Sequence, residues 1–258
     1  MGHVSSKDGT HIAFDRLGSG PPVVLVGGGS TDRTANAPLA DLLARRFTVI
    51  NYDRRGRADS GDTPPYRVQR EVEDIEALFA ETGGTACLYG TSSGGALALE
   101  AAASGVPVTK LAMWEPPFSG DESVRPPLDQ VERYHEMIAE GRRSDAVEYF
   151  MSKVVRLPDD FVAYARTQPF WAAQEALAHT LAYDATIMGD YSIPSERAAR
   201  VDVPTLVLAG GADIPWMRDT ARALADALPR GEVKILEGQG HDVDQSLIAE
   251  ALTEFFEG

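Results

Sequence analysis

The chain has 258 residues, of which 43% are hydrophobic and 24% charged, the proportions of an ordinary globular protein. Its 24 Lys and Arg face 39 Asp and Glu, and the resulting net charge of −15 argues against a nucleic-acid partner, whose phosphates it would repel. No apolar run is long enough for a transmembrane helix. The pattern of a secretory signal, a basic start followed by an apolar run, is not seen either. We therefore expect a cytoplasmic protein with no membrane partner. The single cysteine, Cys87, excludes an internal disulfide and a cysteine-rich metal site.

Short β-like runs alternate with helical patterns over the first 115 residues. Apolar spacing predicts strands over 11–17, 23–26, 47–53, 85–90 and 108–115. It predicts helices over 38–47, 68–84 and 94–104. Because strands separated by helices form parallel pairs, this order predicts the α/β class, with a mostly parallel sheet covered by helices on both faces.

The pattern changes between about Pro116 and Arg200, where no strand-like run occurs. Several apolar stripes at helical spacing, separated by prolines, predict an all-helical segment there. The strand pattern resumes over 203–211 and 232–238, with helices expected over 216–228 and 247–256. We therefore predict a core of residues 1–116 and 201–258, interrupted by residues 117–200, which we call the helical insertion.

The sequence Gly90-Thr91-Ser92-Ser93-Gly94 matches the pattern G-x-S-x-G and lies between a predicted strand and a predicted helix. A turn this tight forces the serine into a strained backbone conformation, and the flanking glycines avoid a clash with it. The turn also places the hydroxyl near a helix N-terminus, where developing negative charge is favoured. Ser92 is therefore the predicted nucleophile.

A serine nucleophile needs a base, and His241 is the best placed of the five histidines. It lies in a glycine-rich loop after the last predicted strand, at the carboxyl edge of the sheet that also carries Ser92. The other histidines lie near the amino terminus or in the helical insertion: His3, His11, His135 and His179. Protonation would disable such a base, so activity is expected to fall on acidification.

The base in turn needs a carboxylate to orient it. Asp213 and Glu115 both follow a predicted strand, so both can reach the same edge of the sheet. We favour Asp213, with Glu115 as the alternative.

An oxyanion needs hydrogen-bond donors, and Gly27-Gly28-Gly29-Ser30 offers unobstructed backbone N–H groups directly after the strand over 23–26. We predict an oxyanion hole formed by the N–H groups of Gly28, Gly29 and Ser93. A dinucleotide phosphate loop is the competing interpretation. It lacks a full G-x-G-x-x-G followed directly by a helix, so we expect neither a nucleotide cofactor nor a metal.

Together these segments resemble the α/β-hydrolase superfamily, in its serine-nucleophile branch with a helical cap. The run YDRRGRADSG over 52–61 is similar to the family's Asp-x-Arg-Gly-x-Gly-x-Ser segment, with Ala58 in place of a usual glycine. Gly27 and Gly28 stand where many relatives have His-Gly. The resemblance implies an α/β-hydrolase fold whose cap is the helical insertion.

The predicted function is hydrolysis of a small ester, lactone or thioester through an acyl-enzyme on Ser92, without a cofactor. Two alternatives stay open: a cofactor-free perhydrolase, haloperoxidase-like enzyme or carbon–carbon hydrolase with the same triad, and a non-catalytic binding protein on the same fold. We expect a monomer or homodimer whose partner is a small-molecule substrate. The side chains expected to contact that substrate are aromatic: Trp114, Phe170, Trp171 and Trp216.

Overall fold

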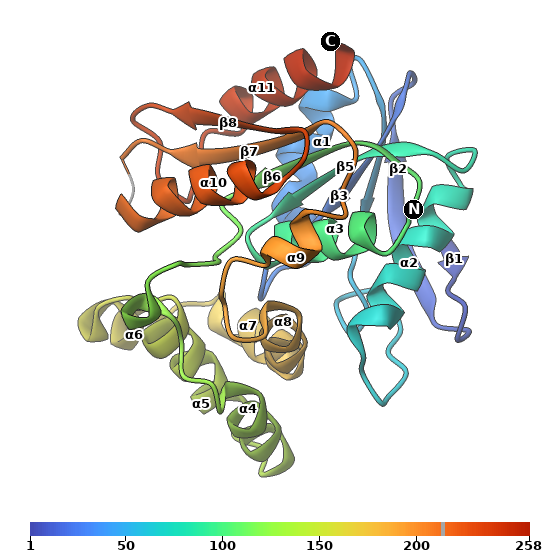
Figure 1. Cartoon of the computed structure of the whole chain (residues 1–258). Coiled ribbons are helices and arrows are strands. Elements are labelled where there is room, and N and C mark those ends of the chain that lie inside the picture. The colour runs from blue at the N-terminus through green and yellow to red at the C-terminus, as the bar shows by residue number, and fades with distance from the viewer. Residues whose placement is uncertain (213–214) are drawn as a thin grey trace.

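The computed structural model describes residues 1–212 and 215–258 and contains an eight-stranded sheet in the order β1-β2-β4-β3-β5-β6-β7-β8 (Figure 1). The strands are β1 (Gly2–Ser5), β2 (His11–Leu17), β3 (Pro22–Val26), β4 (Thr48–Tyr52), β5 (Ala86–Thr91), β6 (Val108–Trp114), β7 (Thr205–Gly210) and β8 (Gly231–Leu236). Neighbours from β4 to β8 pair in parallel, whereas β1 and β2 are antiparallel. The predicted α/β class with a mostly parallel sheet is confirmed.

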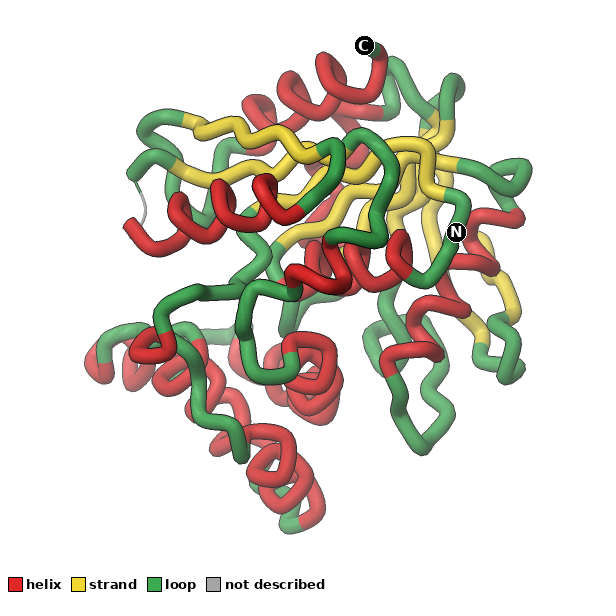
Figure 2. The backbone as a smooth tube through the Cα atoms, viewed as in Figure 1, coloured by secondary structure: helices red, strands yellow, loops and turns green. Residues whose placement is uncertain are grey.

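Helices cover both faces of this sheet, as Figure 2 shows. The helices outside the helical insertion are α1 (Ala37–Leu43), α2 (Val68–Ala80), α3 (Ser93–Ala103), α10 (Pro215–Ala227) and α11 (Gln245–Glu257), with a 3-10 turn η1 (Arg33–Asn36). One apolar cluster packs α1 and α11 against one face, and a second packs α2, α3 and α10 against the other. Because both faces are buried, the central strands are mostly apolar runs, as is typical of parallel strands.

Most element ends differ by a few residues from the sequence-based prediction, and one strand and one helix end have a clear physical reason. Strand β1 was not predicted, since GHVS has only a half-buried alternation and forms by pairing with β2 at the edge of the sheet. Helix α1 ends at Leu43 rather than at Phe47, because Phe47 is buried at the entry to β4.

Every element between β6 and β7 is helical: η2 (Glu122–Val124), α4 (Gln130–Ala139), α5 (Arg143–Tyr149), the π-helical η3 (Phe150–Val154), α6 (Asp159–Ala165), α7 (Trp171–Leu177), η4 (Ala178–Thr180), α8 (Leu181–Met188) and α9 (Ser195–Ala198). In Figure 1, α4 to α8 lie together below the sheet. They have an apolar core of their own, which includes Tyr134 and Trp171. Helix α8 contributes Ala185 to that core and Met188 to the core of the sheet, so it joins the two.

Across the described parts of the chain, no helix combines the length and the apolar character needed to cross a bilayer.

Candidate active site

Ser92 sits at the junction of β5 and α3 with φ 55° and ψ −126°, a conformation that costs a side-chain-bearing residue free energy. The surrounding packing explains the two glycines of the motif. A Cβ on Gly94 would lie 2.4 Å from the carbonyl oxygen of Gly27, and one on Gly90 would lie 2.3 Å from that of Gly94. The turn is thus closed by backbone-to-backbone contacts that only glycine permits.

The glycine loop after β3 passes directly against this turn. A Cβ on Gly28 would lie 3.3 Å from the Cβ of Ser92, and one on Gly29 would lie 3.5 Å from the Oγ of Ser93. In the described part of the chain, we find no hydrogen-bond acceptor for the backbone N–H groups of Gly28, Gly29 and Ser93. Gly28 therefore packs against Ser92 and Gly29 packs against Ser93, and these two glycines and Ser93 carry the three unpaired N–H groups.

Glu115 holds the imidazole of His241. Its Oε2 lies 2.6 Å from Nδ1 of His241, and its Oε1 accepts the backbone N–H of Gly210 at 2.7 Å. The Glu115 side chain is wholly buried, whereas that of His241 is 45% exposed. Both carboxylate oxygens are thus engaged, and Nε2 is the ring nitrogen left for proton transfer.

The structure therefore distinguishes between the two candidate acids, Glu115 and Asp213. The place beside Nδ1 that we expected for Asp213 is held by Glu115, the alternative, and Asp213 itself lies outside the described residues. The reason is positional: Glu115 follows β6, the immediate neighbour of β5, and its φ of 43° turns the chain at the edge where Ser92 lies.

Trp114 hydrogen-bonds both the turn that contains Ser92 and the loop that contains His241. Its backbone oxygen accepts the N–H of Ser92 at 2.8 Å, and its indole Nε1 donates to the backbone oxygen of His241 at 3.1 Å. Burial and then the charge of Glu115 raise the pKa of Tyr89, so this phenol stays neutral beside the site.

The four aromatic residues expected at the substrate fall into two groups. Trp114 is fully buried, and Trp171 is buried in the core of the helical insertion with its indole N–H donated to Ser144, so neither presents a free face. Because Trp114 and Trp171 are buried, the expectation that they contact a substrate is corrected. Phe170 is 47% exposed and Trp216 is partly exposed in the first turn of α10, so both remain available.

Charged residues that the sequence analysis did not identify as site residues contact the glycine loop and the turn around Ser92. Arg54, Arg57 and Asp184 are all buried and contact the glycine loop or Ser93. The available signal was the density of arginines in YDRRGRADSG, within a chain that is otherwise strongly acidic. Among the described residues, no group of three or more His, Cys, Asp or Glu side chains is arranged to hold a metal ion.

The family model described as "Alpha/beta hydrolase family" matches residues 23–255, and the chain belongs to this family. An α/β hydrolase from Sphaerobacter thermophilus superimposes with a TM-score of 0.93 at 53% identity, covering 99% of this chain and 100% of that one. A thermophilic esterase from Thermogutta terrifontis superimposes with a TM-score of 0.74 at 22% identity, over 99% and 97% of the two chains. The second likeness shows the fold alone.

Two curated relatives are also similar in sequence. The uncharacterized hydrolase YraK of Bacillus subtilis is 36% identical over 96 residues, and the match spans about a third of either chain (36% of this one and 35% of YraK). A zearalenone hydrolase of Cladophialophora bantiana is 25% identical over 251 residues, covering 91% of this chain and 88% of the relative. These relatives are hydrolases, and the chain is a hydrolase of the α/β family.

Proposed function

We propose that the protein is a serine hydrolase of small carboxylic esters, lactones or thioesters, with Ser92 as nucleophile, His241 as base and Glu115 as the orienting acid. The observation that carries the proposal is the contact between Glu115 and Nδ1 of His241. Glu115 follows β6, the strand next to β5, and β5 ends directly before the strained Ser92. A carboxylate at Nδ1 fixes the tautomer whose Nε2 can accept a proton.

In the proposed reaction, Ser92 Oγ attacks the carbonyl carbon while its proton passes to Nε2 of His241. The N–H groups of Gly28, Gly29 and Ser93 stabilise the negative oxygen of the tetrahedral intermediate. The protonated imidazole then gives its proton to the leaving group, and a water molecule activated by the same histidine releases the acid from Ser92.

The ester and lactone class is supported by relatives that act as hydrolases. Solved structures with the same fold include esterases and an enol-lactonase from Burkholderia xenovorans, and one curated relative is a zearalenone hydrolase. Perhydrolysis and carbon–carbon cleavage use the same three groups, so a substrate panel separates them from ester hydrolysis.

The test is covalent labelling. We expect a fluorophosphonate to add one phosphonyl group to the native protein, which peptide mass spectrometry locates on Ser92. The Ser92→Ala variant should stay unlabelled. Ser104→Ala is the matched control, because Ser104 lies exposed just after the other end of α3. A native protein that stays unlabelled and hydrolyses no short-chain nitrophenyl ester would overturn the proposal and favour a ligand-binding protein on this fold.

A further inference from the structure

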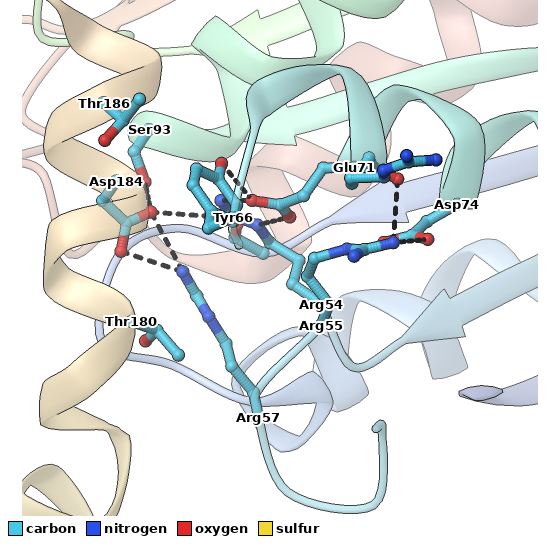
Figure 3. A network of polar contacts seen from close by, with 12 residues as sticks. Arg54, Arg55, Arg57, Tyr66, Glu71, Asp74, Ser93, Thr180, Asp184 and Thr186 are labelled. Atoms are coloured by element: carbon cyan, nitrogen blue, oxygen red, sulfur yellow. Dashed lines mark hydrogen bonds and ion pairs between the residues drawn. The ribbon is translucent and has the colours of Figure 1, made fainter. Parts of the chain in front are cut away.

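A buried ion cluster lies directly behind the nucleophile's turn (Figure 3). It consists of Arg54 and Arg57 from the loop after β4, Glu71 from α2 and Asp184 from α8, each at most 7% exposed in its side chain. The two positive and two negative charges balance. Buried charges are tolerated when opposite charges pair and hydrogen-bond, and here each carboxylate accepts from at least one of the two arginines. Among the described residues, Nε of Arg57 has no hydrogen-bond partner.

Asp184 is the centre of this cluster. Its Oδ1 accepts from Arg54 Nη1 at 2.7 Å, and its two oxygens accept from Arg57 Nη2 at 2.9 and 2.8 Å. Arg54 is held from its other side by Glu71, through two bonds of 2.7 Å. Burial acts to raise the pKa of Asp184, but Arg57 and Arg54 outweigh it and hold that pKa below its usual value, so the carboxylate stays charged.

The two arginines hydrogen-bond the backbone carbonyl groups of the glycine loop. Arg54 Nη1 donates to the oxygen of Gly27 at 3.3 Å, and Arg57 Nη1 donates to the oxygen of Gly28 at 2.5 Å. In a planar trans peptide, the C=O of one residue and the N–H of the next point in opposite directions. Fixing these two oxygens therefore aims the N–H groups of Gly28 and Gly29 away from the cluster.

The remaining donor is fixed by the same carboxylate. Ser93 Oγ donates to Oδ1 of Asp184 at 2.8 Å, so the residue that follows the nucleophile is anchored by its side chain. A Cβ on Gly29 would lie 3.3 Å from Oδ2 of Asp184, which shows how closely the loop packs on this group.

We propose that Asp184 is a positioning residue for the oxyanion hole, which it assembles by holding Arg54, Arg57 and the Ser93 hydroxyl in one network. The inference rests on the proposed function, since it assigns a role within that reaction. Because Asp184 belongs to α8, the helical insertion supplies a residue that positions the oxyanion donors.

The experiment compares Asp184→Asn and Ser93→Ala with the wild type at a temperature where all are folded. A misaimed donor weakens binding of the transition state and not of the substrate, so kcat should fall while KM changes little. Removing an oxyanion donor outright costs roughly 10²–10³-fold. We expect a loss of about 10–100-fold in kcat for Asp184→Asn and a smaller loss, about 3–10-fold, for Ser93→Ala.

Inhibition by a trifluoromethyl ketone is the readout that a merely structural role would not move. Its tetrahedral adduct with serine places an oxyanion in the hole, so its affinity should fall in proportion to kcat/KM. Tyr183→Phe is the matched control: it removes a 2.8 Å bond from α8 to Asp62 but touches none of the cluster's hydrogen bonds, and it should leave both quantities unchanged.

Ketone affinity within twofold of the wild type in Ser93→Ala would overturn the inference, and this variant decides alone if Asp184→Asn fails to fold. A rise in KM with unchanged kcat would overturn it as well. If the wild type forms the Ser92 adduct while the variants behave normally, only this inference fails; if the wild type forms no adduct, the proposed function fails.

Discussion

Glu115→Gln tests the acid assignment most directly, because its effect follows from two hydrogen bonds. Gly210 N–H donates to Oε1 at 2.7 Å, so the single oxygen of a glutamine must stay there to avoid two facing donors. Its NH₂ group then faces Nδ1 of His241, the atom now 2.6 Å from Oε2. An NH₂ can only donate, so Nδ1 loses its proton and Nε2 carries it.

A histidine protonated at Nε2 cannot accept the proton of Ser92. The equivalent change in serine proteases lowers kcat by about 10⁴, or about 5 kcal/mol at 1.36 kcal/mol per tenfold. We expect a loss of about 10³–10⁴-fold in kcat for a nitrophenyl ester, with an unchanged circular dichroism spectrum, since the side chain keeps its size. Asp213→Asn is the control and should stay within about threefold of the wild type. Activity within tenfold in Glu115→Gln, or the large loss in Asp213→Asn, would refute the assignment.

The remaining predictions concern stability. Ser92→Gly should melt roughly 2–4 °C above Ser92→Ala, about 1 kcal/mol, because glycine adopts φ 55° without strain; equal melting temperatures would contradict this. Gly94→Ala should abolish folding or lower Tm severely, whereas Gly95→Ala, whose Cβ would lie 3.2 Å from its nearest neighbour, should be tolerated within a few degrees; differential scanning fluorimetry checks both. Asp8→Asn should cost about 2 kcal/mol at neutral pH, roughly 4–8 °C, because Asp8 accepts from buried Arg55 at 3.0 Å. Burial acts to raise the pKa of Asp8, but hydrogen bonds from Arg55 and Thr10 lower it overall, so its stabilisation is complete above the unfolded pKa of about 3.9 and is lost as the pH falls through the folded value. The difference in Tm should therefore shrink below about pH 4, and a difference independent of pH would contradict the role of the charge.

The fold was accessible from the sequence because its signals are local. Strand β3, for example, is an apolar run between prolines and a run of glycines, and α2 carries a clear 3.6-residue period. Strand β1 was not accessible, since four residues with a glycine carry no such period and depend on pairing with β2. The role of α8 was hidden for the same reason, because it follows from which cores the helix meets.

The site divides along the same line. The G-x-S-x-G segment around Ser92 is a contiguous motif, so it could be located from the sequence. The choice between Glu115 and Asp213 depends on strand order, which a single sequence does not reveal. Asp184 gave no signal at all: it lies 127 and 130 positions from the arginines that keep it charged, on a helix whose other buried residues are mostly apolar.

Backbone strain marks the site in a way that composition could not. Ser30, Ser92 and Glu115 have φ of 54°, 55° and 43°, and they follow the ends of β3, β5 and β6, three neighbouring strands. Each such residue costs about 1–3 kcal/mol and persists only when its surroundings over-determine it. The surroundings do so here: Gln174 of α7 bonds both the hydroxyl and the carbonyl of Ser30, the glycine contacts close the turn at Ser92, and both oxygens of Glu115 are engaged. These contacts, which outweigh the strain, keep Ser92, Glu115 and the glycine loop in a fixed relation, and the proposed oxyanion hole requires such a fixed arrangement if it is to act without reorganising.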